Sequence, residues 1–184
     1  ALCDVLFVSH IHSDHADKVV ADQFLQAGKP VVTPTNIWKG TPANHIQWRD
    51  EKVLDKTLEL LNKASLKVRI FPGHQDNVPN NVYAVTLPNG KTFMHTGDQY
   101  NQEDNTWLTK VGSHTKVDAL LAHCWMHPMK EIVEGVNPKQ VILGHENEME
   151  HSIDHREAYW LTFNRMRPVK IPYVIMAWGE HLKL

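Results

Sequence analysis

The sequence has little of several features that define whole classes of protein. Two cysteines among 184 residues, Cys3 and Cys124, are too few for a disulfide framework, and we expect both to be small buried residues. The apolar runs Val5–Val8 and Tyr173–Trp178 fall far short of the ~20 residues that a helix needs to cross a bilayer. A membrane is therefore not an expected partner.

The sequence also lacks an excess of positive charge. The formal net charge is −2 at pH 7, and no block of like charges interrupts the sequence. Non-specific binding of nucleic acid needs a broad positive field, which this composition does not provide. We therefore expect no nucleic-acid partner and a small molecule as the substrate.

The start of the sequence lacks the features of a secretory signal. The opening ALCDVLFVSH has no basic segment, contains Asp4 and leads directly into polar residues. It is typical of a core strand, and a cytoplasmic location is the default expectation.

Histidine, by contrast, is abundant, with 13 of 184 residues. The rest of the composition, 42% hydrophobic and 22% charged, is that of a globular protein. No repeat, low-complexity tract or linker divides the chain, so we expect residues 1–184 to form one domain. Histidine in this quantity indicates metal binding.

Hydrophobic patterns predict a mixed α/β (α+β) protein. The predicted helices cover residues 16–27, 128–136 and 153–164. The predicted strands cover residues 2–8, 30–33, 66–71, 82–87, 92–95, 117–122, 140–143 and 173–177. Segment 53–62 fits both a helix and a strand, and Asn89-Gly90 predicts a two-residue hairpin that makes the middle of the chain antiparallel.

A dense group of metal-ligand residues directly follows the first predicted strand. In the motif His10-Ile11-His12-Ser13-Asp14-His15, the alternation of an extended segment lets His10 and His12 face one metal. The chain must then turn, so that Asp14 and His15 point in a different direction from His10 and His12. This arrangement suits two adjacent metal ions. About 0.004 such motifs are expected by chance in a chain of this composition, so the motif is specific.

Three further candidate ligands follow predicted strands through a glycine. His74 comes after Pro72-Gly73, Asp98 after His95-Thr96-Gly97, and His145 after Gly144. Each pattern places a ligand where a rigid strand gives way to a loop, and glycine permits close approach of the backbone. The repetition predicts one shared site.

These motifs, at intervals of 59, 24 and 47 residues from His15 onward, resemble the metallo-β-lactamase superfamily. The resemblance covers nearly the whole chain and implies an αβ/βα four-layer sandwich with a dinuclear site. By this resemblance the first metal is held by His10, His12 and His74, the second by Asp14, His15 and His145, and Asp98 bridges the two.

The stretch Asn80–Val85, followed by His95-Thr96-Gly97-Asp98, is most similar to the branch that contains ascorbate-phosphate-lactonase-like hydrolases. One feature departs from the superfamily pattern, because only nine residues precede His10. The resemblance therefore implies that further strands lie upstream and that this chain holds an N-terminally incomplete sandwich. A sheet face left bare in this way favours homo-oligomers.

The ligand set of five imidazoles and two carboxylates suits Zn²⁺ best and leaves Mn²⁺ or Fe²⁺ open. Zinc lowers the pKa of bound water, so we expect a metal-activated hydroxide to attack a small ester, lactone, amide or phosphodiester. The expected catalytic residues are Asp14, Asp98, which orients the nucleophile, and His123, which follows a buried strand and donates to the substrate or leaving group.

Two other functions remain open. The same residues suit a non-catalytic structural or sensing metal site, which has no open coordination position. An iron oxidoreductase is the second alternative, although the related diiron enzymes usually carry Glu where this chain has His12.

Overall fold

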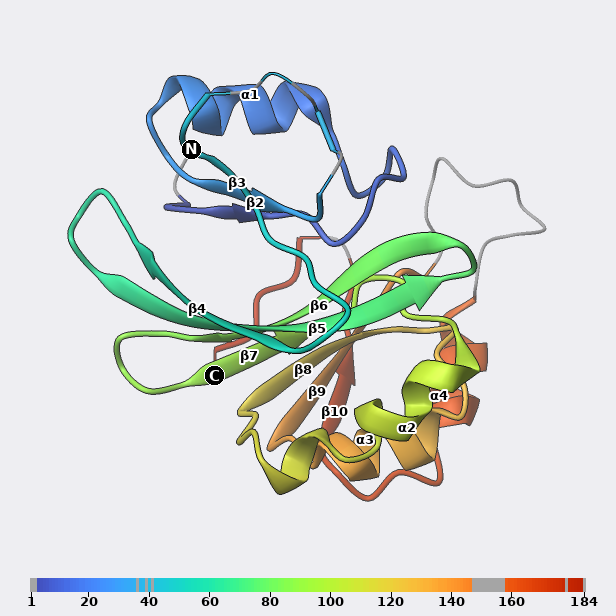
Figure 1. Ribbon diagram of the computed structural model, residues 1–184. Coiled ribbons are helices and arrows are strands. Elements are labelled where there is room, and N and C mark those ends of the chain that lie inside the picture. Colours follow the sequence, from blue (N-terminus) through green and yellow to red (C-terminus); the bar gives the residue numbers. More distant parts are fainter. Residues whose placement is uncertain are drawn as a thin grey trace.

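Two β-sheets, each covered by helices on its outer face, make up the protein (Figure 1). The computed structural model describes residues 3–35, 37–38, 40, 42–146, 158–177 and 179–183. Helix α1 (Lys18–Gln26) covers the smaller sheet, and α2 (Asn105–Leu108), α3 (Met129–Val136) and α4 (Tyr159–Met166) cover the larger one. The layers run helix, sheet, sheet, helix, which confirms the predicted αβ/βα sandwich.

The smaller sheet has three parallel strands in the order β1 (Leu6–Phe7), β2 (Val31–Thr33) and β3 (His45–Gln47). The first strand is shorter than predicted, and its residues are half-buried rather than fully buried. The sequence analysis missed β3, which is too short to show a periodic pattern. Strand β1 lies at the edge of this sheet, where a further strand could pair with it. Such upstream strands stay a prediction.

Helix α1 connects β1 to β2. Asp17 caps its first turn, because a side-chain oxygen of Asp17 accepts hydrogen bonds from the backbone N–H groups of Val19 and Val20. Ala21, Phe24 and Leu25 are the buried residues of the helix. These contacts position the chain that leaves β1, which carries the His10–His15 motif.

The larger sheet has seven strands in the order β10-β9-β8-β7-β6-β5-β4. Their bounds are β4 Leu54–Glu59, β5 Ser65–Gln75, β6 Val78–Thr86, β7 Thr92–His95, β8 Ala119–His123, β9 Gln140–Gly144 and β10 Tyr173–Ile175. Strands β4 to β7 are antiparallel, and β7 to β10 are parallel. The antiparallel middle of the chain is confirmed.

Two local predictions in the antiparallel half need correction. Segment 53–62, for which helix and strand were both possible, contains strand β4. Its residues Leu54 to Glu59 pair with residues 65–70 of β5. Strand β5 does not end at Phe71 but continues through Pro72-Gly73 to Gln75. A Cβ at Gly73 would lie 2.1 Å from Oε1 of Gln99, so glycine is needed there for close packing rather than for a turn.

The hairpin between β6 and β7 is present, with a longer loop than predicted. The N–H of Leu87 donates to the carbonyl of Lys91, which leaves residues 88–90 in the loop. Gly90 has a φ of 82°, the left-handed conformation that three-residue hairpin loops place at this point.

The predicted helix over 128–136 is confirmed by α3. The predicted helix over 153–164 falls partly on residues 147–157, outside the described residues, and α4 begins at Tyr159. Short α2 was not predicted. Among the described helices, none is long and apolar enough to span a bilayer.

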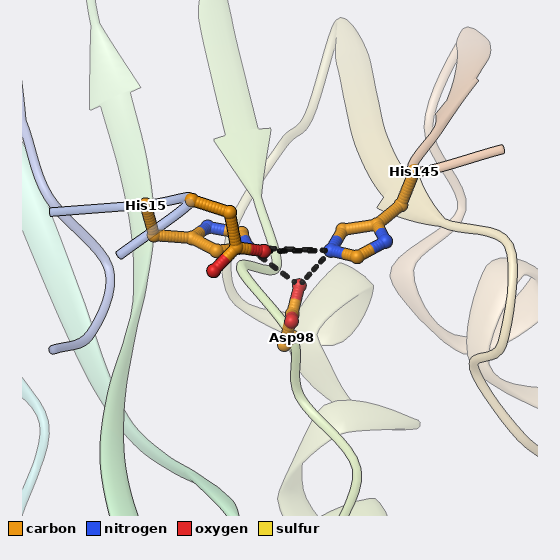
Figure 2. Close-up of side chains that lie close together, drawn as sticks. His15, Asp98 and His145 are labelled. Carbon is orange, nitrogen blue, oxygen red and sulfur yellow. Dashed lines mark hydrogen bonds and ion pairs between the residues drawn. The ribbon is translucent and has the colours of Figure 1, made fainter. Parts of the chain in front are cut away.

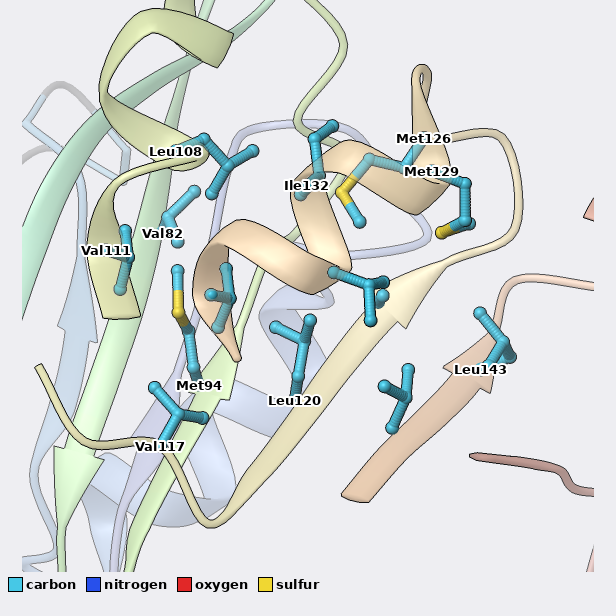
Figure 3. Packing of buried hydrophobic residues seen from close by; sticks show 14 of the residues in the cluster. Val82, Met94, Leu108, Val111, Val117, Leu120, Met126, Met129, Ile132 and Leu143 are labelled. Carbon is cyan, nitrogen blue, oxygen red and sulfur yellow. The ribbon is translucent and has the colours of Figure 1, made fainter. Parts of the chain in front are cut away.

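One face of the larger sheet is buried under its helices, and the antiparallel part of the other face is buried against the smaller sheet. On one face Met94 and Leu120 pack against Leu108 of α2 and Ile132 of α3 (Figure 3). On the other face a second cluster joins the two sheets through Val32, Leu58, Leu66, Val68, Ile70 and Tyr83. Four of the five residues of β8 are buried, which agrees with the continuous apolar run in its sequence.

Candidate metal centre

Three loops that leave β1, β7 and β9 bring candidate ligands together. The ligand atoms of Asp14, His15, Asp98 and His145 all lie within 4.8 Å of one another. His15 and His145 point toward each other with Asp98 below them (Figure 2). Since Asp98 is buried and Asp14 is exposed, one side of this four-residue cluster is open to solvent.

The distances within the cluster match those between the ligands of a single tetrahedral ion. Nε2 of His15 and Nε2 of His145 are 3.3 Å apart, and each lies 3.2 Å from Oδ1 of Asp98. Oδ2 of Asp14 lies 3.4 Å from His15 and 3.7 Å from His145. Ligands bound tetrahedrally at about 2.0–2.1 Å are about 3.3–3.4 Å apart, so this donor set fits a zinc-sized ion.

The other oxygen of Asp98 faces His10, which in turn contacts His12. Nε2 of His10 lies 3.8 Å from Oδ2 of Asp98 and 3.0 Å from Nδ1 of His12. One carboxylate therefore has an imidazole group on each side, with His15 and His145 near Oδ1 and His10 near Oδ2. This arrangement suits a residue that bridges two ions.

A buried serine orients two of these imidazoles. The hydroxyl of Ser9 lies 3.0 Å from Nδ1 of His10 and 3.3 Å from Nδ1 of His15. When both Nδ1 atoms carry a proton and donate to this oxygen, both Nε2 atoms keep lone pairs directed at the cluster. Burial, followed by the nearby charge of His15, lowers the pKa of His10 to about 4, so its ring is neutral as a metal ligand must be.

Asp98 is held as a charged carboxylate. Burial alone would raise its pKa, but the close contacts of Oδ1 with Nε2 of His145 and of His15 hold the pKa well below its usual range. The side-chain amide of Gln75 also donates to Oδ2 of Asp98 at 3.3 Å. Such a buried anion needs cationic or hydrogen-bonding partners, and a bound metal ion would supply the strongest one.

The turn that presents Asp98 is tightly packed. The backbone N–H of Asp98 donates to Oδ1 of Asn80, and the N–H of Gly97 donates to Nδ1 of His95. Gly97 has a φ of 55°, and a Cβ there would lie 2.2 Å from Oδ1 of Asn80 and 2.6 Å from Cβ of Ser9. Glycine is therefore required at this position for both backbone and packing reasons.

His74, the remaining expected ligand, lies in a separate hydrogen-bonded group. Its Nε2 is 3.0 Å from Nη2 of Arg49, and its Nδ1 is 3.1 Å from Oδ2 of Asp104. Since arginine can only donate, Nε2 of His74 accepts and Nδ1 carries the proton that binds Asp104. That tautomer is the one a ligand binding through Nε2 requires, and the role of His74 as a ligand stays a prediction.

Arg49 is the main residue that the sequence analysis missed. It follows β3 and lies 25 residues before His74, so no motif or spacing marked it. Its Nη1 donates to Oδ1 of buried Asn81 at 3.2 Å. Burial lowers the pKa of Arg49, although the charges of Glu51 and Asp104 act in the opposite direction.

His123 lies beside the cluster with a defined tautomer. Its Nε2 donates to the backbone carbonyl of Gln99 at 2.7 Å, which leaves Nδ1 as an acceptor. That buried Nδ1 has no hydrogen-bond partner within the part of the chain that the structure describes. Burial lowers the pKa of His123 to about 4, and the ring lines a cavity of about 220 Å³ together with His15, Asp98 and His145.

Comparison with known proteins identifies the fold. No model of a protein family and no curated protein matches the sequence. Igni18, a metallo hydrolase from Ignicoccus hospitalis, matches with a TM-score of 0.71 at 15% identity, over 96% of this chain and 77% of that one. A mutant of CmlA β-hydroxylase matches with a TM-score of 0.59 at 14% identity, over 95% of this chain and 43% of that one.

A protein described as a zinc-dependent hydrolase of the metallo-β-lactamase superfamily, from Thermotoga maritima, matches with a TM-score of 0.46 at 14% identity over 79% of each chain. Identities this low establish the fold alone. The chain shares the fold of Igni18, and its layers form the αβ/βα sandwich that the resemblance of the sequence motifs implied.

Proposed function

We propose that the protein is a metal-dependent hydrolase whose centre holds two divalent ions, Zn²⁺ by preference. The observation that carries the proposal is the cluster of Asp14, His15, Asp98 and His145, in which the five donor–donor distances that involve His15 or His145 are 3.2–3.7 Å, close to those around one zinc ion. His10, His12 and His74 are the proposed ligands of the other ion, and Asp98 is the proposed bridge. Residues 1–184 act as one domain, because both sheets contribute ligands.

The proposed substrate is a small ester, lactone, amide or phosphodiester. When bound, a zinc pair supplies a hydroxide near neutral pH and polarises the bond that is attacked. Asp98 holds the two histidine groups at a fixed separation through its two oxygens. His123 was expected to donate to the substrate or leaving group, but its Nε2 already donates to the carbonyl of Gln99, so neutral His123 would act beside the cluster as an acceptor through Nδ1.

The cavity favours a catalytic site over a purely structural one. A structural zinc site is closed by its protein ligands, whereas a catalytic site keeps access for water and substrate. Here an opening of about 220 Å³ adjoins His15, Asp98 and His145, and the described donor set contains no thiolate. An iron oxidoreductase remains the competing function, and metal analysis separates it from a hydrolase.

The test combines metal analysis with a hydrolysis screen. Wild type, His145→Ala and the exposed-histidine control His114→Ala are purified, analysed for zinc, manganese and iron, and assayed on ester, lactone, thioester and phosphodiester substrates. We expect two zinc ions and hydrolysis in wild type and control. In His145→Ala we expect loss of at least one ion and a drop in hydrolysis of about 10³-fold or more, since the metal provides the nucleophile.

Full hydrolysis by a metal-free variant would contradict the mechanism. One saturated ion without hydrolysis would favour the structural function. Iron with oxygen-dependent turnover would favour the oxidoreductase.

A further inference from the structure

The guanidinium of Arg49 has a setting that differs from that of Arg69, the other partly buried arginine among the described residues. Arg69, for comparison, forms two hydrogen bonds with the carboxylate of Asp55, at 2.7 and 2.9 Å. Arg49 instead donates to two neutral acceptors, Oδ1 of Asn81 and Nε2 of His74. Within the described chain Arg49 forms no ion pair with a carboxylate, so its charge is balanced only at a distance.

A partly buried cation without a carboxylate partner is costly. A guanidinium carries five N–H donors, and the described contacts of Arg49 use Nη1 and Nη2 once each. The neighbouring carboxylate of Asp104 is already engaged, since its Oδ2 binds both His74 and Gln99. The remaining donors of Arg49 are therefore free to bind an anion.

Buried hydrogen bonds of Asn81 fix the position of Arg49. Asn81 is fully buried, and its Nδ2 donates to the carbonyl of Trp48 and to the hydroxyl of Tyr83. The same asparagine thus holds the backbone just before Arg49 and accepts from its guanidinium. Its own backbone N–H donates to the carbonyl of Ser9 at 2.8 Å, which ties this position to the start of the histidine motif.

A second chain of contacts links Arg49 to the candidate metal centre. Arg49 binds His74, and the next residue, Gln75, donates to Oδ2 of Asp98. This oxygen is the one that faces His10. Arg49 is therefore connected, through His74 and Gln75, to the oxygen of Asp98 that faces His10.

We infer that Arg49 binds an oxyanion of the substrate, a carboxylate or a phosphate, beside the candidate metal centre. Arginine suits this task because its planar fork matches both groups and stays charged. The inference rests on the proposed function, which it narrows to anionic substrates. If Nε2 of His74 becomes a metal ligand, Arg49 loses that neutral acceptor and a further donor becomes available to the anion.

Direct binding measurements test the role of Arg49 without turnover. Succinate and inorganic phosphate are titrated calorimetrically into the metal-free protein, so that no ion binds the probe. We expect wild type to bind at least one probe, and Arg49→Gln to bind it about 10-fold to 100-fold more weakly, the range for a charge-assisted hydrogen bond. The control Arg69→Gln, which removes an arginine already paired with Asp55, should bind like wild type.

The two probes separate a carboxylate substrate from a phosphate one. Cooperative melting checks the fold of each variant. If Arg49→Gln does not fold, Arg49→Lys is used instead. We expect Arg49→Lys to bind the probe about fivefold more weakly than wild type, because lysine lacks the planar donor fork of arginine. No binding by wild type, or equal binding by the folded variant, overturns the inference. Arg49-dependent binding in a protein that hydrolyses nothing refutes the proposed function but leaves the anion site standing.

Discussion

At the scale of single residues, Asp98 links most of the features of the candidate centre. Its two oxygens face different histidines, and its backbone is held by Asn80 and by the turn at Gly97. Ser9 adds a second constraint, because one hydroxyl contacts Nδ1 of both His10 and His15. These supporting contacts decide where the ligand atoms point, and they should matter for metal affinity although they contribute no ligand themselves.

We expect Ser9→Ala to weaken zinc binding by about 10-fold to 100-fold, because both imidazoles lose the oxygen that orients them. Competition against a chromophoric chelator measures this change. Ser113→Ala is the control, since the exposed hydroxyl of Ser113 bonds only to the carbonyl of Lys110 in the described structure. Equal zinc affinity in Ser9→Ala and wild type would show that the ligands are positioned by other contacts.

At the scale of elements, Asp118 joins three strands of the larger sheet. Oδ2 accepts from the N–H of Thr92 at the start of β7, and Oδ1 lies 2.7 Å from Nζ of Lys139, just before β9. Asp118 itself precedes β8. The hydrogen bond from Lys139, and then that from Thr92, lowers the pKa of Asp118. The charged form of the Asp118 carboxylate therefore stabilises this end of the parallel half of the sheet.

This lowered pKa predicts a pH-dependent loss of stability. The unfolded chain binds the proton more tightly, so the contribution of Asp118 is fully present above the unfolded pKa of about 3.9 and is lost as the pH falls through the lower folded pKa. We expect Asp118→Asn to reduce the free energy of unfolding by about 1 kcal/mol at pH 7, a value discounted for solvent screening.

Urea unfolding of wild type and Asp118→Asn across pH 3–7 measures the effect, and the difference should narrow below about pH 4. Glu134→Gln is the control, because Glu134 forms an exposed pair with Lys130, and exposed pairs contribute little to stability. A difference that stays constant down to pH 3 would assign the loss to the amide substitution rather than to the charge.

The relation between sequence and elements is clearest where the two disagree. Segment 53–62 was ambiguous because its leucines fit two periods, and pairing with β5 selected the strand. Pro72-Gly73 has the local chemistry of a turn, yet both residues continue β5 because Asn81 and Asn80 pair with them across the sheet. Contacts between distant segments overrode the local preference in both places.

At the scale of the whole molecule, the candidate ligands connect the two sheets. Asp14 and His15 follow β1 of the smaller sheet, whereas Asp98 and His145 follow β7 and β9 of the larger one. Binding of an ion to this cluster would therefore link the sheets directly. The unfolded chain has no such preformed site, so metal binding should add to the stability of the fold.

We expect zinc at 100 times its dissociation constant to stabilise the protein by about 2.7 kcal/mol, which corresponds to a rise in Tm of about 5–10 °C for a chain of this size. Scanning calorimetry with zinc and with a chelator provides the measurement. Asp98→Asn should show little of this rise. A Tm that does not depend on zinc would mean that no ion binds across the two sheets.

The sequence by itself determined the mixed α/β class and the chemistry of the candidate ligands, and the resemblance of its motifs implied the αβ/βα sandwich. His10–His15, Asp98 and His145 were recognisable because ligand type, short spacing and a position after an apolar strand are local properties of the chain. Continuous apolar runs likewise predicted strands buried on both faces.

Only the tertiary structure decided which side chains surround those ligands. Arg49 approaches His74, Ser9 joins two imidazoles, and His123 receives its tautomer from the carbonyl of Gln99. These contacts connect elements that are distant along the chain or depend on the direction of a side chain within the packed interior. Neither hydrophobic period nor motif spacing encodes them, because both describe neighbours in sequence, whereas the contacts arise from packing the two sheets against each other.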